Sequence, residues 1–421
     1  MDYIKICGKK KLFGSVEVQG SKNAALPVIS AAVLTGGRSV LKNCPDLSDT
    51  RAAVQILAYL GAKCEFENGR LVIDTKNLEN KVINSALMGK LRSSITFAGA
   101  LAGRFGYAKL AMPGGCELGP RPIDMHIEAF KKLGIDVQCQ NGYIELKGKP
   151  RGGEIVLPFP SVGATQNAVL AAVLAKEETT IINCAKEPEI VCMQRFLKSA
   201  GANMEGAGSA VIKVYPCGGL CDAEHIIDGD RIAAATYMAC FLSSGGEGSV
   251  CGVDKTHLNA VLAVFEQMGA TNILCGENKI DISCREGLKP VMLQTQPYPG
   301  FPTDCLPIIT ALAATCDKTS VFSENIFKNR FHHAQELAKF GADVHIFGKT
   351  CVIKGSKKLC GAEVDACDLR GGASAVIAAL AAEGTTIIKN PCYIDRGYED
   401  ICKHLKSLGA DIKRVTASSE E

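Results

Sequence analysis

No part of the sequence offers an uninterrupted apolar run long enough to cross a bilayer. A membrane-spanning helix needs about 20 consecutive, mostly apolar residues. The N-terminal segment MDYIKICGKKKLFG also lacks the long apolar run of a secretory signal peptide. These two absences favour a cytoplasmic protein with no membrane insertion.

The sequence has little excess of either charge. Its 47 lysine and arginine residues are nearly balanced by 44 aspartate and glutamate residues, which leaves a formal net charge of +3. A protein whose main partner is DNA or RNA usually carries a much larger basic excess. We therefore expect no nucleic-acid partner, whereas anionic small molecules remain possible ligands.

Twenty cysteines are scattered along the chain, but their spacing does not suggest a metal site. No Cys-x-x-Cys pair is present, and the closest pair, Cys217 and Cys221, has no second pair or histidine couple nearby to complete a zinc site. Without an export signal to favour disulfides, most of these cysteines are expected to be small buried hydrophobes. The sequence predicts neither a metal nor another cofactor.

A helical pattern that ends in glycine recurs six times, at intervals of roughly 70 residues. Each glycine follows an amphipathic run such as GYEDICKHLKSLG, where a helix commonly ends in a left-handed residue. An alanine-rich apolar helix precedes each amphipathic helix, and the alternating pattern of a β-hairpin follows five of the glycines. The six glycines are Gly61, Gly134, Gly201, Gly269, Gly341 and Gly409.

The last repeat ends at DIKRV without room for a second hairpin strand, while the N-terminal YIKICG is a strand with no repeat of its own. We expect these two strands to pair. Because 421 residues exceed what one core usually organises, the sequence predicts two domains. Repeats one to three form residues 22–229, and repeats four to six form residues 1–21 plus 230–421. An open solenoid of stacked repeats is the alternative.

Polar clusters follow the strands that lead into the helices. Helix N-termini expose unpaired N–H groups and a partial positive charge, so a ring of them would hold phosphates well. For any single residue, helix capping or a solvated charge is the simpler interpretation. The cations that could support a phosphate site are Lys22, Arg92, Arg121, Arg330, Arg370 and Arg396.

The segment MPGGCELGPRPIDMHI, residues 112–127, gathers glycines and prolines around one cysteine. This composition is typical of a shaped surface loop rather than of a core. The neighbouring cation Arg121 would favour the reactive thiolate form of Cys116. Cys116 is therefore the candidate reactive group.

At these residues the sequence resembles the UDP-N-acetylglucosamine enolpyruvyl transferase family, from end to end. The resemblance implies an α/β fold of two inverse, inside-out barrel domains, each of three repeats with helices inside and sheets outside. Eight segments carry it: GSKNAALP at 20–27, LRSSITFAGAL at 91–101, PGGCELGPRPIDMHI at 113–127, PSVGATQN at 160–167, FPTD at 301–304, ENIFKNRF at 324–331, DLRGGAS at 368–374 and IDRGYE at 394–399.

The activity that the resemblance implies is transfer of the enolpyruvyl group of phosphoenolpyruvate to the 3-hydroxyl of UDP-N-acetylglucosamine, the first committed step of peptidoglycan synthesis. Cys116 would then protonate C3 of phosphoenolpyruvate and could form an adduct at C2, and Asp304 would be the base on the sugar hydroxyl. The same thiol would be the target of epoxide inhibitors such as fosfomycin.

The resemblance also implies two sets of substrate contacts. Phosphoenolpyruvate would be bound by Lys22, Asn23, Arg121 and Arg396, and of these Lys22 and Arg396 are also assigned to catalysis. The UDP-sugar would contact Arg92, Arg121, Pro122, Ile123, Asp124, Met125, Ser161, Val162, Gly163, Asp304, Ile326 and Phe327.

The sequence departs from some relatives at peripheral positions. Pro160 stands where some carry lysine, and Ala233 and Ala235 stand where others carry glutamate and glycine. Two alternative functions remain: the shikimate-pathway enolpyruvyl transferase, which lacks a catalytic cysteine in this loop, and a non-catalytic UDP-sugar-binding paralogue. The PGGC segment disfavours the first, and the complete set of acid, base and clamp disfavours the second.

Overall fold

The computed structural model describes residues 2–114, 123–356 and 358–416. Within these ranges the chain forms two compact units. The N-terminal unit contains residues 20–114 and 123–228, and the C-terminal unit contains residues 2–19 and 229–416. No helix in the described part of the chain is both long and apolar enough to span a membrane.

The N-terminal unit alternates hairpins with pairs of helices. Its strands are β3 (Arg38–Lys42), β4 (Lys63–Glu67), β5 (Arg70–Asp74), β6 (Tyr107–Ala111), β7 (Asp136–Gln140), β8 (Tyr143–Lys147), β9 (Gly153–Val156), β10 (Thr179–Ile182), β11 (Asn203–Glu205), β12 (Val211–Tyr215) and β13 (Ala223–Ile226). Its helices are α1 (Lys22–Ala31), η1 (Ala32–Leu34), α2 (Ser48–Tyr59), α3 (Ser85–Met88), η2 (Arg92–Ile95), α4 (Thr96–Phe105), α5 (Asp124–Lys132), α6 (Val162–Ala172) and α7 (Pro188–Ser199).

The C-terminal unit repeats this alternation. Its strands are β1 (Tyr3–Cys7), β2 (Phe13–Glu17), β14 (Glu247–Cys251), β15 (Thr271–Gly276), β16 (Lys279–Ser283), β17 (Met292–Gln294), β18 (Thr319–Ser323), β19 (Asp343–Phe347), β20 (Thr350–Lys354), β21 (Glu363–Asp365), β22 (Thr385–Lys389) and β23 (Asp411–Val415). Its helices are α8 (Arg231–Ser244), η3 (Lys255–Leu258), α9 (Asn259–Gln267), η4 (Thr303–Cys305), α10 (Leu306–Ala314), α11 (His332–Ala338), α12 (Leu369–Ala381), η5 (Pro391–Arg396) and α13 (Ile401–Ser407).

The sheets share one plan. In the sheet ordered β17-β18-β20-β19, β17 runs parallel to β18, which pairs antiparallel with the hairpin formed by β19 and β20. The same order recurs in β9-β10-β12-β11, β13-β3-β5-β4 and β2-β14-β16-β15. In the sheet β6-β8-β7, a single parallel bridge between Ile83 and Leu110 occupies the place of the parallel strand. The hairpins predicted after five of the glycines are therefore confirmed.

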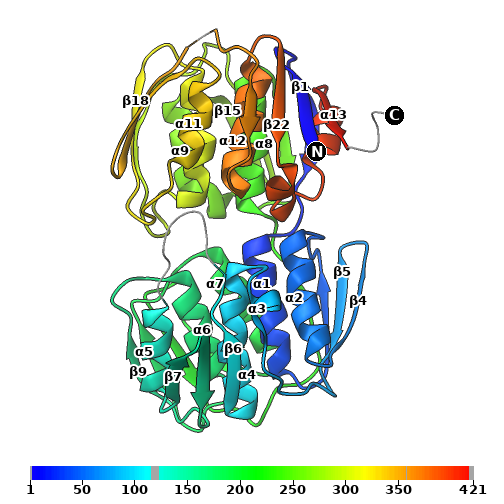
Figure 1. Cartoon of the computed structure of the whole chain (residues 1–421), viewed down its shortest axis with the longest axis vertical. Helices are drawn as coiled ribbons and strands as arrows, with labels where there is room; N and C mark the ends of the chain where they lie inside the picture. The colour runs from blue at the N-terminus through cyan, green and yellow to red at the C-terminus, as the bar shows by residue number, and fades with distance from the viewer. Residues whose placement is uncertain (1, 115–122, 357, 417–421) are drawn as a thin grey trace. The chain divides into compact units, whose positions relative to one another are not determined.

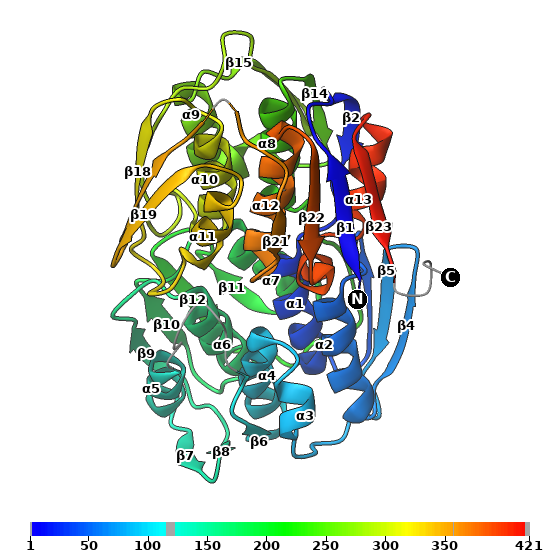
Figure 2. The same ribbon diagram turned by 45° about the horizontal axis from the view of Figure 1, so that its top comes forward.

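The N-terminal strand completes the last repeat. In the sheet β21-β22-β1-β23, β1 lies between β22 and β23 and is antiparallel to both, with Tyr3 opposite Lys389 and Val415 (Figure 2). In the N-terminal unit, β13 returns to the first repeat by pairing parallel to β3. The predicted strand pairing is confirmed. Since an open solenoid does not return its last segment to its first repeat, the solenoid interpretation is wrong.

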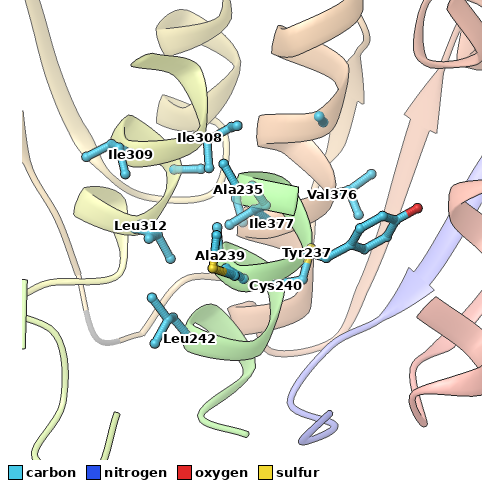
Figure 3. Close-up of a cluster of buried hydrophobic side chains, with 14 of the residues drawn as sticks. Ala235, Tyr237, Ala239, Cys240, Leu242, Ile308, Ile309, Leu312, Val376 and Ile377 are labelled. Atoms are coloured by element: carbon cyan, nitrogen blue, oxygen red, sulfur yellow. The ribbon is translucent and has the colours of Figure 1, made fainter. Parts of the chain in front are cut away.

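The alanine-rich helices form the core of each unit. In the C-terminal unit α8, α10 and α12 pack against one another, between β18 on one side and β22 and β1 on the other (Figures 1 and 2). Figure 3 shows Ala239 of α8, Leu312 of α10 and Ile377 of α12 turned toward one another, and all three are fully buried. Burying a leucine or isoleucine side chain in this way contributes about 1.5–3 kcal/mol. Alanine lets these helices approach closely.

The amphipathic helices end as the sequence predicts. All six repeated glycines have left-handed backbones, with φ from 78° at Gly134 to 102° at Gly201. Glycine adopts this conformation without the steric penalty that a Cβ atom imposes. The six helix ends are therefore confirmed.

The expectation that most of the cysteines are buried is wrong, because only seven of the 18 described cysteines are buried. Among the described cysteines, Cys139, Cys221, Cys360 and Cys392 are exposed. Cys139, for example, lies on β7, an edge strand in which Val137 is half-buried and the other four residues are exposed. Whether a cysteine is buried depends on which segments pack against it, and its residue type does not determine that.

Candidate active site

Asp304 lies in η4, at the start of the helical segment that continues into α10. Its Oδ1 accepts a hydrogen bond of 3.2 Å from Nη2 of Arg330, and its Oδ2 lies 3.7 Å from Nη2 of Arg370. The arginine side chains are 1% and 2% exposed, whereas that of Asp304 is 30% exposed. This arrangement presents a partly open carboxylate between two buried guanidinium groups.

The interpretation of Asp304 as a helix cap is not supported. The residues at the N-cap positions of η4 and α10 are Pro302 and Cys305, respectively. The carboxylate of Asp304 instead forms ion pairs with side chains from two other segments. Arg330 also donates from Nε to the carbonyl oxygen of Thr303 at 3.1 Å, so one guanidinium holds both the backbone and the carboxylate of the turn.

Arg370 is a buried cation, and only some of its N–H donors form hydrogen bonds with the described residues. Its Nη1 donates to the hydroxyl of Tyr398 at 3.4 Å, while Nε and Nη2 have no hydrogen-bond partner among the described residues. Burial alone would lower the pKa of this guanidinium, but interactions with Tyr398, Asp304 and Asp230 raise it above its usual value. Buried donors of a charged group are costly to leave unsatisfied. The ion pair with Asp304, at 3.7 Å from Nη2, compensates the charge in place of those hydrogen bonds.

Arg396 ends η5 and is half-buried. The backbone that follows it is held by Gln19, which is only 7% exposed. The Gln19 Nε2 donates to the carbonyl of Gly397 at 3.0 Å, and its Oε1 accepts from the amide of Glu399 at 2.8 Å. Gln19 thus fixes the segment that carries Arg396, although Gly397 and Glu399 lie 378 and 380 positions after it in the sequence.

Lys22 is the first residue of α1, and it is buried. Its Nζ lies 3.3 Å from Oδ2 of Asp49, which is also buried and lies in the first turn of α2. Asn23 follows Lys22 and is half-buried. A buried ion pair of this kind holds the ammonium group in one place, as a fixed anion-binding group requires.

The N-terminus of α6 carries Ser161, Val162 and Gly163. The hydroxyl of Ser161 caps the helix by accepting from the amide of Ala164 at 3.4 Å. The capping interpretation therefore holds for this side chain. The amides of Val162 and Gly163 belong to the first turn, where N–H groups have no acceptor within the helix and the helix dipole is positive. These amides suit an anion such as a diphosphate.

His126 of α5 lies against this helix terminus. A Cβ atom on Gly163 would be 3.2 Å from Cε1 and 3.4 Å from Nε2 of the ring, so glycine leaves room for the imidazole. Burial, followed by the charge of Arg92, lowers the pKa of His126 to about 4. The ring is consequently neutral near pH 7.

Asn167 fixes the tautomer of His126. Its Oδ1 accepts from the amide of Gly99 at 2.9 Å, so both remaining contacts involve its amide nitrogen. That nitrogen donates to the carbonyl of Ile95 at 3.0 Å and to Nδ1 of His126 at 2.7 Å. The imidazole proton therefore resides on Nε2, which faces the N-terminus of α6.

Arg92 connects this region to the cysteine segment. Its Nη1 donates to the carbonyl oxygens of Pro113 at 3.4 Å and Gly114 at 3.5 Å. Three of the predicted site residues, Cys116, Arg121 and Pro122, lie outside the described residues.

The other predicted contacts differ in exposure. The side chain of Ile123 belongs to the hydrophobic core, which leaves only its backbone for a ligand, whereas Asp124 is exposed at the start of α5 and Met125 is half-buried. In the C-terminal unit, Ile326 and Phe327 are half-buried in the segment between β18 and α11.

The sequence did not predict roles for Glu324, His126 and Asn167. Each lies inside or beside a segment that was singled out, but each is a buried polar residue whose partners come from other segments. The one usable signal was Asn167 directly before the apolar, alanine-rich part of α6, since a buried amide needs partners.

The sequence was also compared with known proteins. Residues 6–405 match the family described as EPSP synthase (3-phosphoshikimate 1-carboxyvinyltransferase). A UDP-N-acetylglucosamine 1-carboxyvinyltransferase 2 of Caldanaerobacter subterraneus subsp. tengcongensis is 44% identical over 417 residues, covering 99% of this chain and 100% of the relative. A UDP-N-acetylglucosamine 1-carboxyvinyltransferase 1 of Symbiobacterium thermophilum is 43% identical, covering 97% and 94% of the two chains.

Solved structures share the fold. The enolpyruvyl transferase NikO from Streptomyces tendae superimposes with a TM-score of 0.89 at 22% sequence identity, covering 99% of both chains. An EPSP synthase from Acinetobacter baumannii gives a TM-score of 0.74 at 19% identity, covering 99% of this chain and 100% of that chain. These similarities confirm the predicted α/β fold.

Proposed function

Because the chain belongs to the family of UDP-N-acetylglucosamine 1-carboxyvinyltransferases, we propose that it transfers the enolpyruvyl group of phosphoenolpyruvate to the 3-hydroxyl of UDP-N-acetylglucosamine and releases phosphate. It is an enzyme of the enolpyruvyl transferase class. The observation that supports the proposed reaction most is the partly open carboxylate of Asp304 between Arg330 and Arg370. We assign the reaction to the first committed step of peptidoglycan synthesis, in the cytoplasm.

Addition to an enol ether needs a proton donor and a proton acceptor. In the proposed reaction the thiol of Cys116 gives its proton to C3, and the sugar 3-oxygen bonds to C2 as Asp304 takes the hydroxyl proton. The thiolate of Cys116 then takes a proton back from C3 while phosphate leaves C2 and carries away the proton held by Asp304, which restores the double bond and both side chains. General acid or base assistance of this kind is typically worth about 10²- to 10⁴-fold.

The charge of phosphoenolpyruvate needs fixed cations. We assign Lys22, Arg121 and Arg396 to its phosphate and carboxylate groups, with Asn23 beside them. The buried ion pair of Lys22 and the Gln19 contacts beyond Arg396 support this assignment, because both limit the positions that the cations can take. Each charge-assisted contact is worth about 1.5–3 kcal/mol.

Recognition of the UDP-sugar is assigned to a second set of residues. In the N-terminal unit these residues are Arg92, Arg121, Pro122, Ile123, Asp124, Met125, Ser161, Val162 and Gly163, to which we add the neutral Nε2–H donor of His126. The first-turn amides of α6, which have no acceptor within the helix, favour a diphosphate at this position. In the C-terminal unit the residues are Asp304, Ile326 and Phe327.

The direct test measures phosphate release from phosphoenolpyruvate by the purified chain. We expect release only when UDP-N-acetylglucosamine is also present, with no release when shikimate 3-phosphate replaces it. Release with shikimate 3-phosphate alone would favour the shikimate-pathway activity named for the matching family and for one of the similar structures. Binding of the UDP-sugar without phosphate release would indicate a non-catalytic paralogue.

A second test addresses Cys116. We expect fosfomycin to abolish phosphate release and to label one peptide, the one that contains Cys116. The exposed Cys139, Cys221, Cys360 and Cys392 provide an internal control, because accessibility alone would label them as well. Inactivation with the label on one of these four, and an unmodified Cys116, would contradict the assignment.

A further inference from the structure

Glu324 is a carboxylate buried in the C-terminal unit, just after β18, and it is 1% exposed. Burying a carboxylate is costly unless hydrogen bonds replace its hydration. Three donors supply such hydrogen bonds to the carboxylate of Glu324. Its Oε1 accepts from the amides of Ile326 at 2.6 Å and Phe327 at 2.9 Å, and its Oε2 accepts from the hydroxyl of Thr303 at 2.8 Å.

These three hydrogen bonds join two separate segments of the chain. The two amides belong to the segment after β18, and Thr303 is the first residue of η4, the turn that carries Asp304. The two segments are joined again by Arg330, which donates to the carbonyl of Thr303 at 3.1 Å and to Asp304 at 3.2 Å. Glu324 therefore contacts Thr303, the residue that directly precedes Asp304.

We propose that Glu324 is a positioning residue for the acceptor sugar, because it fixes the distance between the Asp304 turn and the 326–327 backbone. This inference rests on the proposed function, in which Asp304 takes the proton of the sugar hydroxyl and residues 326 and 327 contact the UDP-sugar. Correct placement of the hydroxyl at its base matters because a misplacement of about 1 Å can cost about 10²-fold in rate. Glu324 itself does not reach the reacting atoms.

A carboxylate suits this position better than other side chains do. Two N–H groups converge on one oxygen while a hydroxyl donates to the other, and only an ionised carboxyl accepts at both oxygens. In Glu324→Gln, the amide oxygen can still accept both N–H bonds, and its NH₂ group can donate to the hydroxyl of Thr303. Glutamine should therefore retain most of the positioning, whereas alanine removes all three bonds.

The experiment compares Glu324→Ala and Glu324→Gln with Glu336→Ala in the full-length chain. Glu336 is a matched control in the same unit, since its Oε2 accepts from the amide of Asp365 at 2.8 Å and so also joins two segments, away from Asp304. For each variant, kcat and the KM for UDP-N-acetylglucosamine and for phosphoenolpyruvate are measured. Calorimetric binding of UDP-N-acetylglucosamine and thermal unfolding complete the set.

For Glu324→Ala we expect kcat/KM for the acceptor to fall about 10²-fold, with weaker binding of UDP-N-acetylglucosamine. The KM for phosphoenolpyruvate should change by less than about threefold, and Glu324→Gln should recover to within about tenfold of the wild type. Glu336→Ala should lower the unfolding temperature without changing these ratios.

If Glu324→Ala does not fold, Thr303→Val gives the same test with one bond removed. Thr303→Val should lower kcat/KM for the acceptor by less than about 10²-fold, because the two amide bonds to Glu324 remain, and it should change the KM for phosphoenolpyruvate by less than about threefold. Equal losses for both substrates would overturn the inference, as would a Glu324→Ala or Thr303→Val variant that behaves like Glu336→Ala. A wild-type chain that transfers nothing to UDP-N-acetylglucosamine would instead refute the proposed function, and this inference with it.

Discussion

Asp304 shares its carboxylate between two buried guanidinium groups, so its charge affects both stability and the proposed chemistry. We expect Asp304→Asn to lower kcat by about 10²- to 10⁴-fold. Unfolding in urea should show a loss of about 1.5–3 kcal/mol, because Arg330 keeps its charge in a buried position. The control is Asp281→Asn, which breaks the 3.1 Å pair with Lys279 on a strand and should cost less than about 1 kcal/mol. An Asp304→Asn enzyme with unchanged kcat would contradict the role of this residue as base.

His333 predicts a pH dependence of stability. It is fully buried, its ring contacts the hydroxyl of Thr310 and the carbonyl of Arg330, and burial is the largest cause that lowers its pKa to about 4. An unfolded histidine has a pKa of about 6.5. Between these values the unfolded chain binds the proton more readily than the folded chain, so stability falls as the pH drops from about 6.5 toward 4.

The variant His333→Gln isolates this contribution, because glutamine cannot take up the proton. The free energy of unfolding, measured in urea at a series of pH values, should fall less steeply below pH 6.5 in the variant. The difference in slope should amount to about 3 kcal/mol over the whole window. Parallel curves for the two proteins would show that the ring is protonated in the folded state as readily as in the unfolded state.

At this scale the sequence predicts a residue well when its role is local. The glycine after each amphipathic helix was predictable because the backbone conformation depends on that residue alone. Glu324, Asn167 and the exposed Cys139 were not, because their environments depend on segments far away in the sequence. Lys22 was already one of the candidate cations of the polar clusters, whereas Asp304 was identified as a base through the resemblance, and composition alone would have left it as a helix cap.

At the scale of secondary-structure elements, the simplest test of the repeat is a substitution of Gly201, the glycine that follows α7. Gly201 has φ of 102°, and a Cβ atom there would meet only an ordinary contact at 3.7 Å. We expect Gly201→Ala to destabilise the N-terminal unit by about 1 kcal/mol through backbone strain. Gly218→Ala is the matched control, since Gly218 lies in the same unit, has no neighbour within 4 Å and has no left-handed backbone. Equal urea midpoints for the two variants would contradict the interpretation of Gly201 as a required left-handed residue.

The strands and helices themselves were easier to predict than which strands lie side by side in a sheet. Hairpins such as β19 and β20 follow from alternation around a short turn, and the pairing of β1 with β23 followed from counting strands. The parallel pairing of β13 with β3 did not follow, because nothing local to residues 223–226 indicates which edge they join. Sheet order depends on contacts between segments that lie far apart in the sequence.

For the whole molecule, we propose that residues 22–229 and residues 1–21 plus 230–421 are two domains. Ile6 of β1 is fully buried in the core of the C-terminal unit. We expect Ile6→Ala to cost about 2–5 kcal/mol and to increase hydrogen exchange in β22 and β23. Protection in β3 and β5 should remain. Lys5→Ala, on the other face of β1, is the control. An equal loss of protection in β3 and β5 would mean that the chain unfolds as one unit.

The central claim is that this chain joins an enolpyruvyl group to the 3-oxygen of a UDP-linked amino sugar. The most direct measurement is an NMR spectrum of the purified chain turning over phosphoenolpyruvate labelled with carbon-13 at C2, in the presence of UDP-N-acetylglucosamine. The account predicts that the label appears in a vinyl ether carbon coupled to the proton at C3 of the sugar, together with stoichiometric phosphate. Unchanged phosphoenolpyruvate in that mixture, with labelled product only when shikimate 3-phosphate is supplied, would contradict it.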